Sequence, residues 1–358
     1  MATVRTMANA STLDWTVFVL VVGLRLVVPL FIPRFPLPAI LAALVIDGVD
    51  KSIFAAFTGL SLDNYQSYDK ALDIYYLTIA YLAVLRNWRN PFAVGVGAFL
   101  WYYRLVGVLA FEITGARWLL MVFPNTFEYF VIAIEVVRTR WDANRLSKAA
   151  FLWTAGLIWV VIKLPQEWWI HVAQLDFTDE FGELVTEHPW VWGVLAVLAV
   201  VLVVVGRRVA RRLPPADWPF TLDADVIAAR VGWVPRGPVG VAPTGVGHLV
   251  EKVVLAGLVT MVLFESYPLV EGRLSVVALV VTGTVLVHAA RAALGVEVVV
   301  NTVISVVAML VFAAFATGQP RQVSVGDVLL FAYVVALVVT LYDRYTARRE
   351  ACAQPLSA

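Results

Sequence analysis

Residues 37–59 have the sequence LPAILAALVIDGVDKSIFAAFTG. This stretch is long and apolar enough to cross a lipid bilayer, yet Asp47, Asp50 and Lys51 lie inside it. A charged side chain in the hydrocarbon region costs about 3 kcal/mol even on the most lenient insertion scales, so such residues are rare and usually have a function. The stretch therefore predicts a transmembrane helix that forms part of a functional site.

The composition of the whole chain is that of an integral membrane protein. Of its 358 residues, 61% are hydrophobic and 15% are charged, and the mean hydropathy is +0.82, whereas soluble domains have about 25% charged residues. The net charge of +1, with the basic residues in small clusters, gives no indication of nucleic-acid binding. The single cysteine, Cys352, excludes an internal disulfide and a thiolate metal cluster. We expect an all-α polytopic protein of a bacterial-type plasma membrane.

Apolar runs of spanning length recur along the chain. They predict about eleven transmembrane helices of about 20 residues each, at 15–32, 37–59, 70–86, 91–111, 117–137, 149–172, 190–210, 250–270, 274–293, 296–317 and 325–343. Every second connection is basic, whereas residues 173–189 contain five acidic residues and no basic ones. Because short basic loops stay in the cytoplasm, we expect an exoplasmic N-terminus and a cytoplasmic C-terminus.

The region of residues 213–248 interrupts this pattern. It contains six prolines and follows a basic helix end, which predicts a cytoplasmic linker. Residues 222–233 have the composition of a short interfacial helix, but we expect an irregular tether there. The linker would separate an N-terminal bundle of about seven spans at 1–212 from a C-terminal bundle of about four apolar spans at 249–347, followed by a polar tail at 348–358.

Interior polar residues are concentrated in the second to sixth apolar runs. Under the expected orientation they lie near the middle or in the outer half of each helix, so five helices would bring them to one leaflet. The residues that we expect to meet there are Asp47, Asp50, Asp69, Asp73, Arg104, Asn125, Glu128, Lys163, Glu167 and His171. The last four runs contain few interior polar groups, which favours a scaffold or an oligomer surface.

Helical spacing places the aspartates on common faces. Asp47 lies three residues before Asp50 and four before Lys51, so the three share a face and Asp47 is able to pair with Lys51. Asp69 and Asp73 are also one turn apart. Two acidic pairs on adjacent antiparallel helices are able to hold one or two divalent cations, which makes Asp47, Asp50, Asp69 and Asp73 candidate metal ligands.

The fifth and sixth runs each contribute a polar face beside a proline. The fifth run presents Asn125 and Glu128 together, and the sixth presents the row Lys163, Glu167 and His171. Pro124 and Pro165 interrupt backbone hydrogen bonding close to these groups, which frees carbonyl groups toward the interior of the bundle.

These residue types favour three functions. The first is an enzyme that acts on a lipid-linked or amphipathic, phosphate-bearing substrate. Its catalytic residues would be Asp47, Asp50, Asp69, Asp73 and Glu128, and its substrate-binding residues Arg104, Asn125, Lys163, Glu167 and His171. The second is a proton- or cation-coupled transporter component whose carboxylates line a path. The third is a structural or assembly protein without catalysis, whose buried charges simply pair, Arg104 with Asp50 or Glu128 and Lys163 with Asp73.

Overall fold

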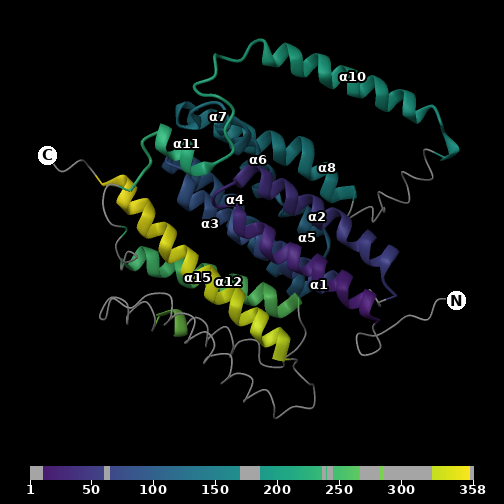
Figure 1. Cartoon of the computed structure of the whole chain (residues 1–358), viewed down its shortest axis with the longest axis vertical. Coiled ribbons are helices and arrows are strands. Elements are labelled where there is room, and N and C mark those ends of the chain that lie inside the picture. Colours follow the sequence, from purple (N-terminus) through teal and green to yellow (C-terminus); the bar gives the residue numbers. More distant parts are fainter. Residues whose placement is uncertain are drawn as a thin grey trace.

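The computed structural model describes residues 11–59, 65–169, 186–235, 239, 245–266, 282–285 and 325–354. The regular secondary structure of these residues is helical, which confirms the predicted all-α class (Figure 1). The elements are α1 (Thr12–Val27), η2 (Val28–Phe31), α2 (Pro36–Phe57), α3 (Tyr65–Asn87), α4 (Pro91–Thr114), α5 (Trp118–Val122), α6 (Thr126–Arg138), η3 (Ala143–Arg145), α7 (Lys148–Leu157), the π-helical η4 (Ile158–Lys163), α8 (Leu164–Glu167), α10 (Val191–Ala210), α11 (Ala224–Arg230), α12 (Val246–Ser266) and α15 (Val325–Ala353).

Several of these helices are long and apolar enough to cross a membrane. By length and composition, the described residues contain five such segments: Thr12–Phe31, Pro91–Phe111, Trp118–Arg138, Lys148–Glu167 and Val191–Arg208. α2 has 22 residues but includes the three charged residues of the opening stretch, which lower its apolar character. The predicted runs at 274–293 and 296–317 lie outside the described residues, apart from 282–285. The chain is therefore a helical protein with several membrane-compatible helices.

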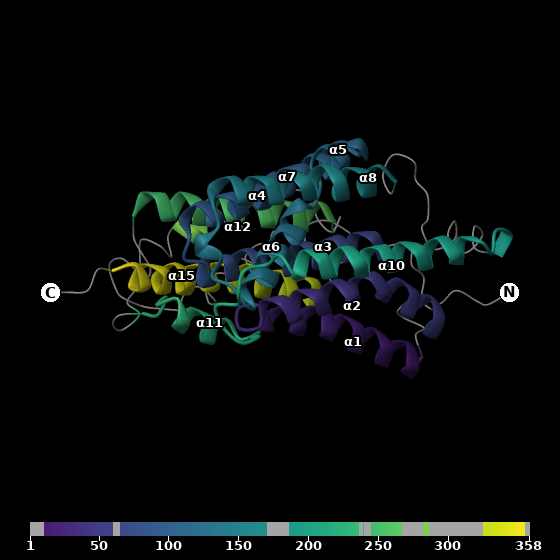
Figure 2. The ribbon, with the colours of Figure 1, turned by 90° about the horizontal axis from the view of Figure 1, so that it is seen from above.

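α3 is the central helix of the bundle. From Leu72 to Leu85 nearly all of its side chains are buried, and a helix that is buried on all sides needs neighbours on all sides. α1, α2 and α6 pack against it, as do the C-terminal helices α12 and α15. Figures 1 and 2 show these helices running alongside one another with α3 among them. Residues of α12 and α15 belong to the same apolar core as those of α2, α3, α4 and α6.

α1 and α2 form a hairpin that is joined at both ends. Near its turn, the Tyr75 hydroxyl of α3 donates to the Leu26 carbonyl at 2.8 Å. At the other end, the buried Asp14 closes a capping box with Ser11 and accepts a hydrogen bond from the Gly59 backbone N–H at 3.0 Å. The hairpin therefore holds α1 and α2 in a defined register, which places the charged residues of the two helices opposite each other.

Arginines from several helix ends meet at one end of the bundle, which we call the basic end. There Arg34 pairs with Asp223 at 3.2 Å, and Asp225 pairs with Arg86 at 2.6 Å and with Arg348 at 3.2 Å. Through Asp223 and Asp225, these contacts join the α1–α2 connection, the last turn of α3 and the last turns of α15. We call the opposite end of the bundle the far end.

The segment that supplies these aspartates was expected to be an irregular tether, and this expectation was wrong. The residues form α11, whose side chains Ala224, Ile227 and Ala228 are buried against the protein. Trp233 follows, donates through Nε1 to the Arg86 carbonyl at 3.2 Å and packs with Ala228 against Cys352. Because these apolar side chains face protein, α11 gains from tertiary packing the stability that so short a helix lacks alone.

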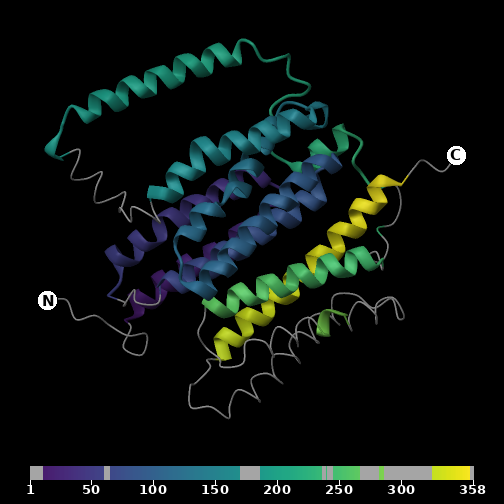
Figure 3. The same cartoon turned by 180° about the vertical axis from the view of Figure 1, so that it is seen from behind.

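α10 lies apart from the other described helices (Figures 1 and 3). Its apolar side chains, such as Val197 and Leu198, are more than half exposed, at 63% and 51%. A helix that is apolar all round and makes few protein contacts has the composition of a segment solvated by lipid.

Candidate functional site

Arg25 of α1 is the centre of a buried ion-pair cluster. Its Nη1 donates to Asp50, and its Nη2 donates to Asp47 and also to Asp73, the latter at 2.9 Å. The side chains of Arg25 and Asp50 are 3% and 0% exposed. A guanidinium presents five N–H groups in a rigid plane, which allows one arginine to bridge three carboxylates from two helices. α1, α2 and α3 are thus joined through one cation.

The three aspartates of this cluster differ in access. Asp47 and Asp73 have side chains that are 25% and 35% exposed, whereas Asp50 is fully enclosed. Asp47 and Asp73 bind the same guanidinium nitrogen, so their carboxyl groups lie next to each other. The accessible part of the cluster is therefore a pair of neighbouring carboxyl groups that share a single hydrogen-bond donor.

Tyr76 connects this cluster to α6. It lies one turn after Asp73 on α3, is buried, and donates its hydroxyl hydrogen bond to Glu128 Oε1. The other oxygen, Glu128 Oε2, accepts from Asn125 Nδ2 at 2.9 Å, and Asn125 Oδ1 accepts from the Glu128 backbone N–H at 3.5 Å. Asn125 is accordingly the N-cap of α6 and also holds the Glu128 carboxylate in place.

The fifth predicted span is interrupted beside this group, as Pro124 indicated. α5 ends at Val122 and α6 begins at Thr126, and the carbonyls freed by the break accept hydrogen bonds from α4. Tyr103 donates to the Val122 carbonyl at 2.9 Å, and Arg104 Nη1 donates to the Phe123 carbonyl at 3.0 Å. We call this interruption the helix break, residues 123–125.

Close approach of α4 to the helix break requires a glycine. A Cβ atom built on Gly107 would lie 2.0 Å from Cβ of Phe123, far inside any real contact. The neighbouring turn carries Arg104, whose Nε is buried without a hydrogen-bond partner in the described residues. Gly107 thus sets the distance at which Arg104 meets the freed carbonyl.

The sixth predicted span approaches the helix break from the other side. Its middle is the π-helical η4, which ends at Lys163, two residues before Pro165. The Lys163 side chain is 4% exposed, and its Nζ lies 4.0 Å from the ring centroid of Tyr129. Glu167 Oε1 accepts from the Asn125 backbone N–H at 3.3 Å. Lys163 is within electrostatic range of both Glu128 and Glu167.

The residues of the site lie at one level of the bundle. Asp50, Asp73 and Lys163 are 14, 14 and 15 residues from the basic ends of their helices, at Pro36, Asn87 and Lys148. At 1.5 Å per residue this is about 21 Å for each. The structure therefore brings Asp47, Asp50, Asp73, Arg104, Asn125, Glu128, Lys163 and Glu167 together, around Arg25 and around the helix break.

Other expectations are not met by the described residues. Lys51 is exposed and forms no ion pair within the described part of the chain, because the partner of Asp47 is Arg25. The pairings of Arg104 with Asp50 or Glu128, and of Lys163 with Asp73, are likewise not found as ion pairs among these residues. His171 and the side chain of Asp69 lie outside the described residues.

A metal ion does not fit the aspartate cluster as it is built. Among the described residues, no group of three or more His, Cys, Asp or Glu side chains is arranged to hold one. The oxygens of Asp47, Asp50 and Asp73 that would ligate a cation accept hydrogen bonds from Arg25 instead. We therefore assign no metal-dependent step to this cluster.

Sequence reasoning missed two members of the site, Arg25 and Tyr76. Arg25 had a detectable signal, since it is the single charge in the run LVVGLRLVVPL at 20–30 and an arginine in such a run costs as much as an aspartate. Tyr76 had none, because a tyrosine in an apolar helix is ordinary. Its role becomes visible only once α3 is placed beside α6.

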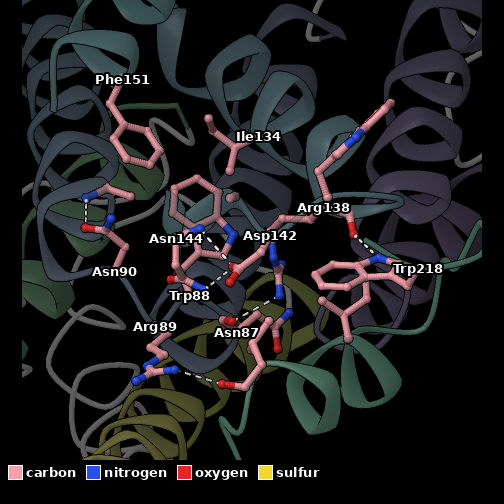
Figure 4. Close-up of a pocket in the computed structure, with 15 residues that line it drawn as sticks. Asn87, Trp88, Arg89, Asn90, Ile134, Arg138, Asp142, Asn144, Phe151 and Trp218 are labelled. Atoms are coloured by element: carbon pink, nitrogen blue, oxygen red, sulfur yellow. Dashed lines mark hydrogen bonds between the residues drawn. The ribbon is translucent and has the colours of Figure 1, made fainter. Parts of the chain in front are cut away.

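A second polar region lies at the basic end and is structural. Figure 4 shows its pocket, where Trp218 Nε1 donates to the Arg138 carbonyl at 3.1 Å and Arg138 Nη2 donates to the Asn87 carbonyl at 3.1 Å. Glu135 pairs with Arg138 and accepts from Trp88 Nε1 at 2.7 Å. The cavity has about 20 Å³ of space, enough for one water molecule. These groups satisfy one another's hydrogen bonds.

No protein-family model, curated protein or solved structure matches this chain. The site is accordingly interpreted from its own geometry and chemistry.

Proposed function

We propose that the protein is a membrane enzyme that binds the anionic head of a lipid-linked or amphipathic substrate at the helix break. Under the positive-inside rule the basic end faces the cytoplasm, and the site then lies in the exoplasmic half of the bilayer. The proposal is carried by one observation: Arg104 and Lys163 meet at the helix break without forming an ion pair to any described carboxylate.

Two cations in such a position are suited to an anion. Lys163 is buried over an aromatic ring. Arg104 donates to the Phe123 carbonyl, and its Nε has no hydrogen-bond partner among the described residues. Charged groups of this kind are costly in a low-dielectric region unless a counter-charge reaches them. α6 also begins here, and the N-terminus of a half-helix adds partial positive charge that attracts anionic groups. A phosphate or carboxylate would bind to Arg104, to Lys163 and to the N-terminus of α6.

The neighbouring carboxyl groups supply acid–base chemistry. Glu128 accepts from Tyr76, and Tyr76 lies one turn from the half-exposed Asp73. In this scheme Arg104 and Lys163 neutralise the head group, and Glu128 takes or returns a proton through the Tyr76 hydroxyl. Asp47 and Asp73 provide further proton acceptors beside the substrate, while Arg25 and the enclosed Asp50 hold them in place.

Binding of a fluorescent phosphatidic acid analogue to the purified protein in nanodiscs tests this proposal. Arg104→Gln and Lys163→Gln each remove a charge-assisted hydrogen bond worth about 1.5–3 kcal/mol, so each should weaken binding about tenfold or more. Arg117→Gln is the matched control, because Arg117 is exposed at the start of α5. Equal affinity in all three variants would contradict the anion site.

Turnover is tested separately. The protein is incubated with a total lipid extract, and the lipids are compared by mass spectrometry before and after. Glu128→Gln and Asp73→Asn should abolish conversion while they retain binding of the analogue. Binding without any conversion would exclude catalysis, and the site would then be one of binding or transport.

A second candidate function is proton- or cation-coupled transport, and the charge balance favours it. Among the described residues, the site contains five carboxyl groups, those of Asp47, Asp50, Asp73, Glu128 and Glu167, against the three cations Arg25, Arg104 and Lys163. An excess of carboxyl groups in such surroundings is stable when protons or another cation neutralise it.

Transport is distinguished from catalysis in liposomes that enclose a pH-sensitive dye. A transporter should equilibrate an imposed pH gradient when the anionic solute is supplied, and Glu128→Gln should stop it. An enzyme should leave the gradient intact. If the variants change only the unfolding temperature, the network is structural and the third function, an assembly protein, is the remaining one.

A further inference from the structure

A second hydrogen-bonded chain enters the bundle from the basic end, through residues that the proposed site does not use. Tyr81 of α3 donates to Glu251 Oε1 at 2.6 Å, and Tyr342 of α15 donates to Glu251 Oε2 at 2.9 Å. His248 Nδ1 lies 3.4 Å from the Tyr342 hydroxyl, and His248 Nε2 lies 3.3 Å from Glu350. Glu251 is on α12, so α3, α12 and α15 are all joined by the chain.

Exposure changes steadily along this chain. The side chains of Glu350 and His248 are 52% and 34% exposed, whereas Tyr342 and Tyr81 are buried. Beyond Tyr81 lies Tyr102 of α4, whose ring is 5.6 Å from that of Tyr81 and whose hydroxyl is buried without a hydrogen-bond partner in the described residues. The chain therefore begins at the surface and ends among core aromatics.

The geometry points to a proton uptake path from the basic end to Glu251. Histidine side chains exchange protons with water near neutral pH. Since the Tyr342 hydroxyl already donates to Glu251, its oxygen is free to accept from His248 Nδ1. In the transfer, the Nδ1–H bond of protonated His248 breaks, Tyr342 gains that proton, and Tyr342 releases its own hydroxyl proton to Glu251. The products are neutral histidine, intact tyrosine and a protonated carboxyl group.

Charged groups from α12 and α15 surround Glu251. Lys252, its neighbour in sequence, is buried in an ion pair with Asp343 at 2.6 Å. Arg349 of α15 is within electrostatic range of Glu251 and Tyr81, and it donates to the Trp88 carbonyl at 2.9 Å. The Glu251 carboxylate thus has two tyrosine donors and a guanidinium nearby.

The path also approaches the proposed site without joining it. Tyr76 and Tyr81 lie five residues apart on α3, about 7.5 Å along the helix. Trp101 and Phe127 are both 0% exposed and pack against the Tyr81 ring. The uptake path is inferred from its own contacts, so it does not depend on the proposed substrate.

Infrared difference spectroscopy and proton uptake together test this inference. Purified protein in nanodiscs is stepped in pH. The protonated carboxyl band and the uptake of protons from solution, reported by a pH-sensitive dye, are followed. Glu251→Gln should remove one titrating carboxyl band, and His248→Gln should slow uptake by about tenfold or more, because a positioned base accelerates proton transfer at least that much.

His188→Gln is the matched control, since His188 is an exposed histidine before α10 and outside the chain. It should leave both readings at the wild-type values. A carboxyl band that persists in Glu251→Gln, or wild-type uptake in His248→Gln, would overturn the inference. Binding of the phosphatidic acid analogue is measured on the same variants, and it should remain unchanged whether or not the uptake path exists.

Discussion

At the scale of single residues, Arg25 is the group on which the aspartate cluster depends. Replacing it with alanine would leave the enclosed Asp50 without its cation. Removal of one partner from a buried ion pair costs about 3–5 kcal/mol, so we expect Arg25→Ala to lower the free energy of unfolding by that amount. Chemical denaturation in detergent micelles, followed by circular dichroism, measures the change.

A double substitution separates charge from packing at this position. In Arg25→Ala/Asp50→Asn, one uncompensated charge is gone, so the double variant should be more stable than Arg25→Ala alone. Arg25→Lys should lie between wild type and alanine, because an ammonium cannot bridge three carboxylates in one plane. If the double variant were less stable than Arg25→Ala, the ionic account of the cluster would be wrong.

Tyr76→Phe tests the link between the two halves of the site. It removes the hydroxyl that donates to Glu128, and both residues are buried. Loss of one partner from such a bond costs about 1–3 kcal/mol, and the ring itself is retained. We expect the free energy of unfolding, measured by chemical denaturation, to fall by this amount. We also expect turnover to be slower than in the wild type. Tyr103→Phe is the comparison variant, since its hydroxyl is on the outside of α4 and should cost less.

Sequence spacing identified faces correctly but not partners. Asp47 and Asp50 do point to one group, as their separation of three residues requires. The partner, however, is Arg25 on the preceding helix and not Lys51 on the same one. Spacing along one helix detects only partners within that helix, whereas the choice between helices depends on register, which here follows from the α1–α2 hairpin.

At the scale of elements, the approach of α4 to the helix break is the most sensitive contact. Gly107→Ala would force Cβ against Phe123, and overpacking of this kind costs about 1–3 kcal/mol. Because Arg104 binds the Phe123 carbonyl, the same change should weaken binding of the phosphatidic acid analogue. Gly95→Ala on the same helix, which has open space around it, should lower neither stability nor affinity.

The prolines of the sequence predicted the irregular elements, whereas composition did not predict the helix in the linker region. Pro124 lies in the helix break. Pro165 lacks the N–H that an α-helix would need, and the stretch before it is π-helical. α11 was missed for a different reason. Its seven residues would not be helical alone. They form a helix because Ala224, Ile227 and Ala228 are buried against the basic end of the bundle.

At the scale of the whole molecule, docking of α11 should depend on pH. Partial burial acts to raise the pKa of Asp223, but hydrogen bonds from the Asp225 backbone and from Arg34 outweigh it and hold that pKa below its ordinary value of 3.8. A carboxylate of this kind favours docking while it is ionised. Its contribution is complete above pH 3.8 and is lost as the pH falls through the lowered value.

The single cysteine reports this docking. Cys352 is 3% exposed and packs against Ala228 and Trp233, so its thiol becomes reactive when α11 leaves. A dithiodipyridine reagent, which reacts with thiols in acid, should label Cys352 faster below pH 3.8 than above it. Asp223→Asn should label faster at neutral pH and show little change on acidification. Equal rates for wild type and variant across the range would contradict the role of Asp223.

The proposed site depends on the orientation of the protein in the membrane, and labelling of two engineered cysteines measures this orientation. Arg117 precedes α5, and Lys148 begins α7, beyond the opposite end of α6. Both residues are exposed. In a Cys352→Ser background, the positive-inside rule predicts that Arg117→Cys reacts with an impermeant maleimide in intact cells and that Lys148→Cys reacts only after permeabilisation. The reverse pattern would place the aspartate cluster near the cytoplasmic face, where a substrate would reach Asp47 and Asp73 from inside the cell. Labelling of both from one side would mean that α5 and α6 do not cross the bilayer, and the interrupted helix would then be a re-entrant segment lining the site.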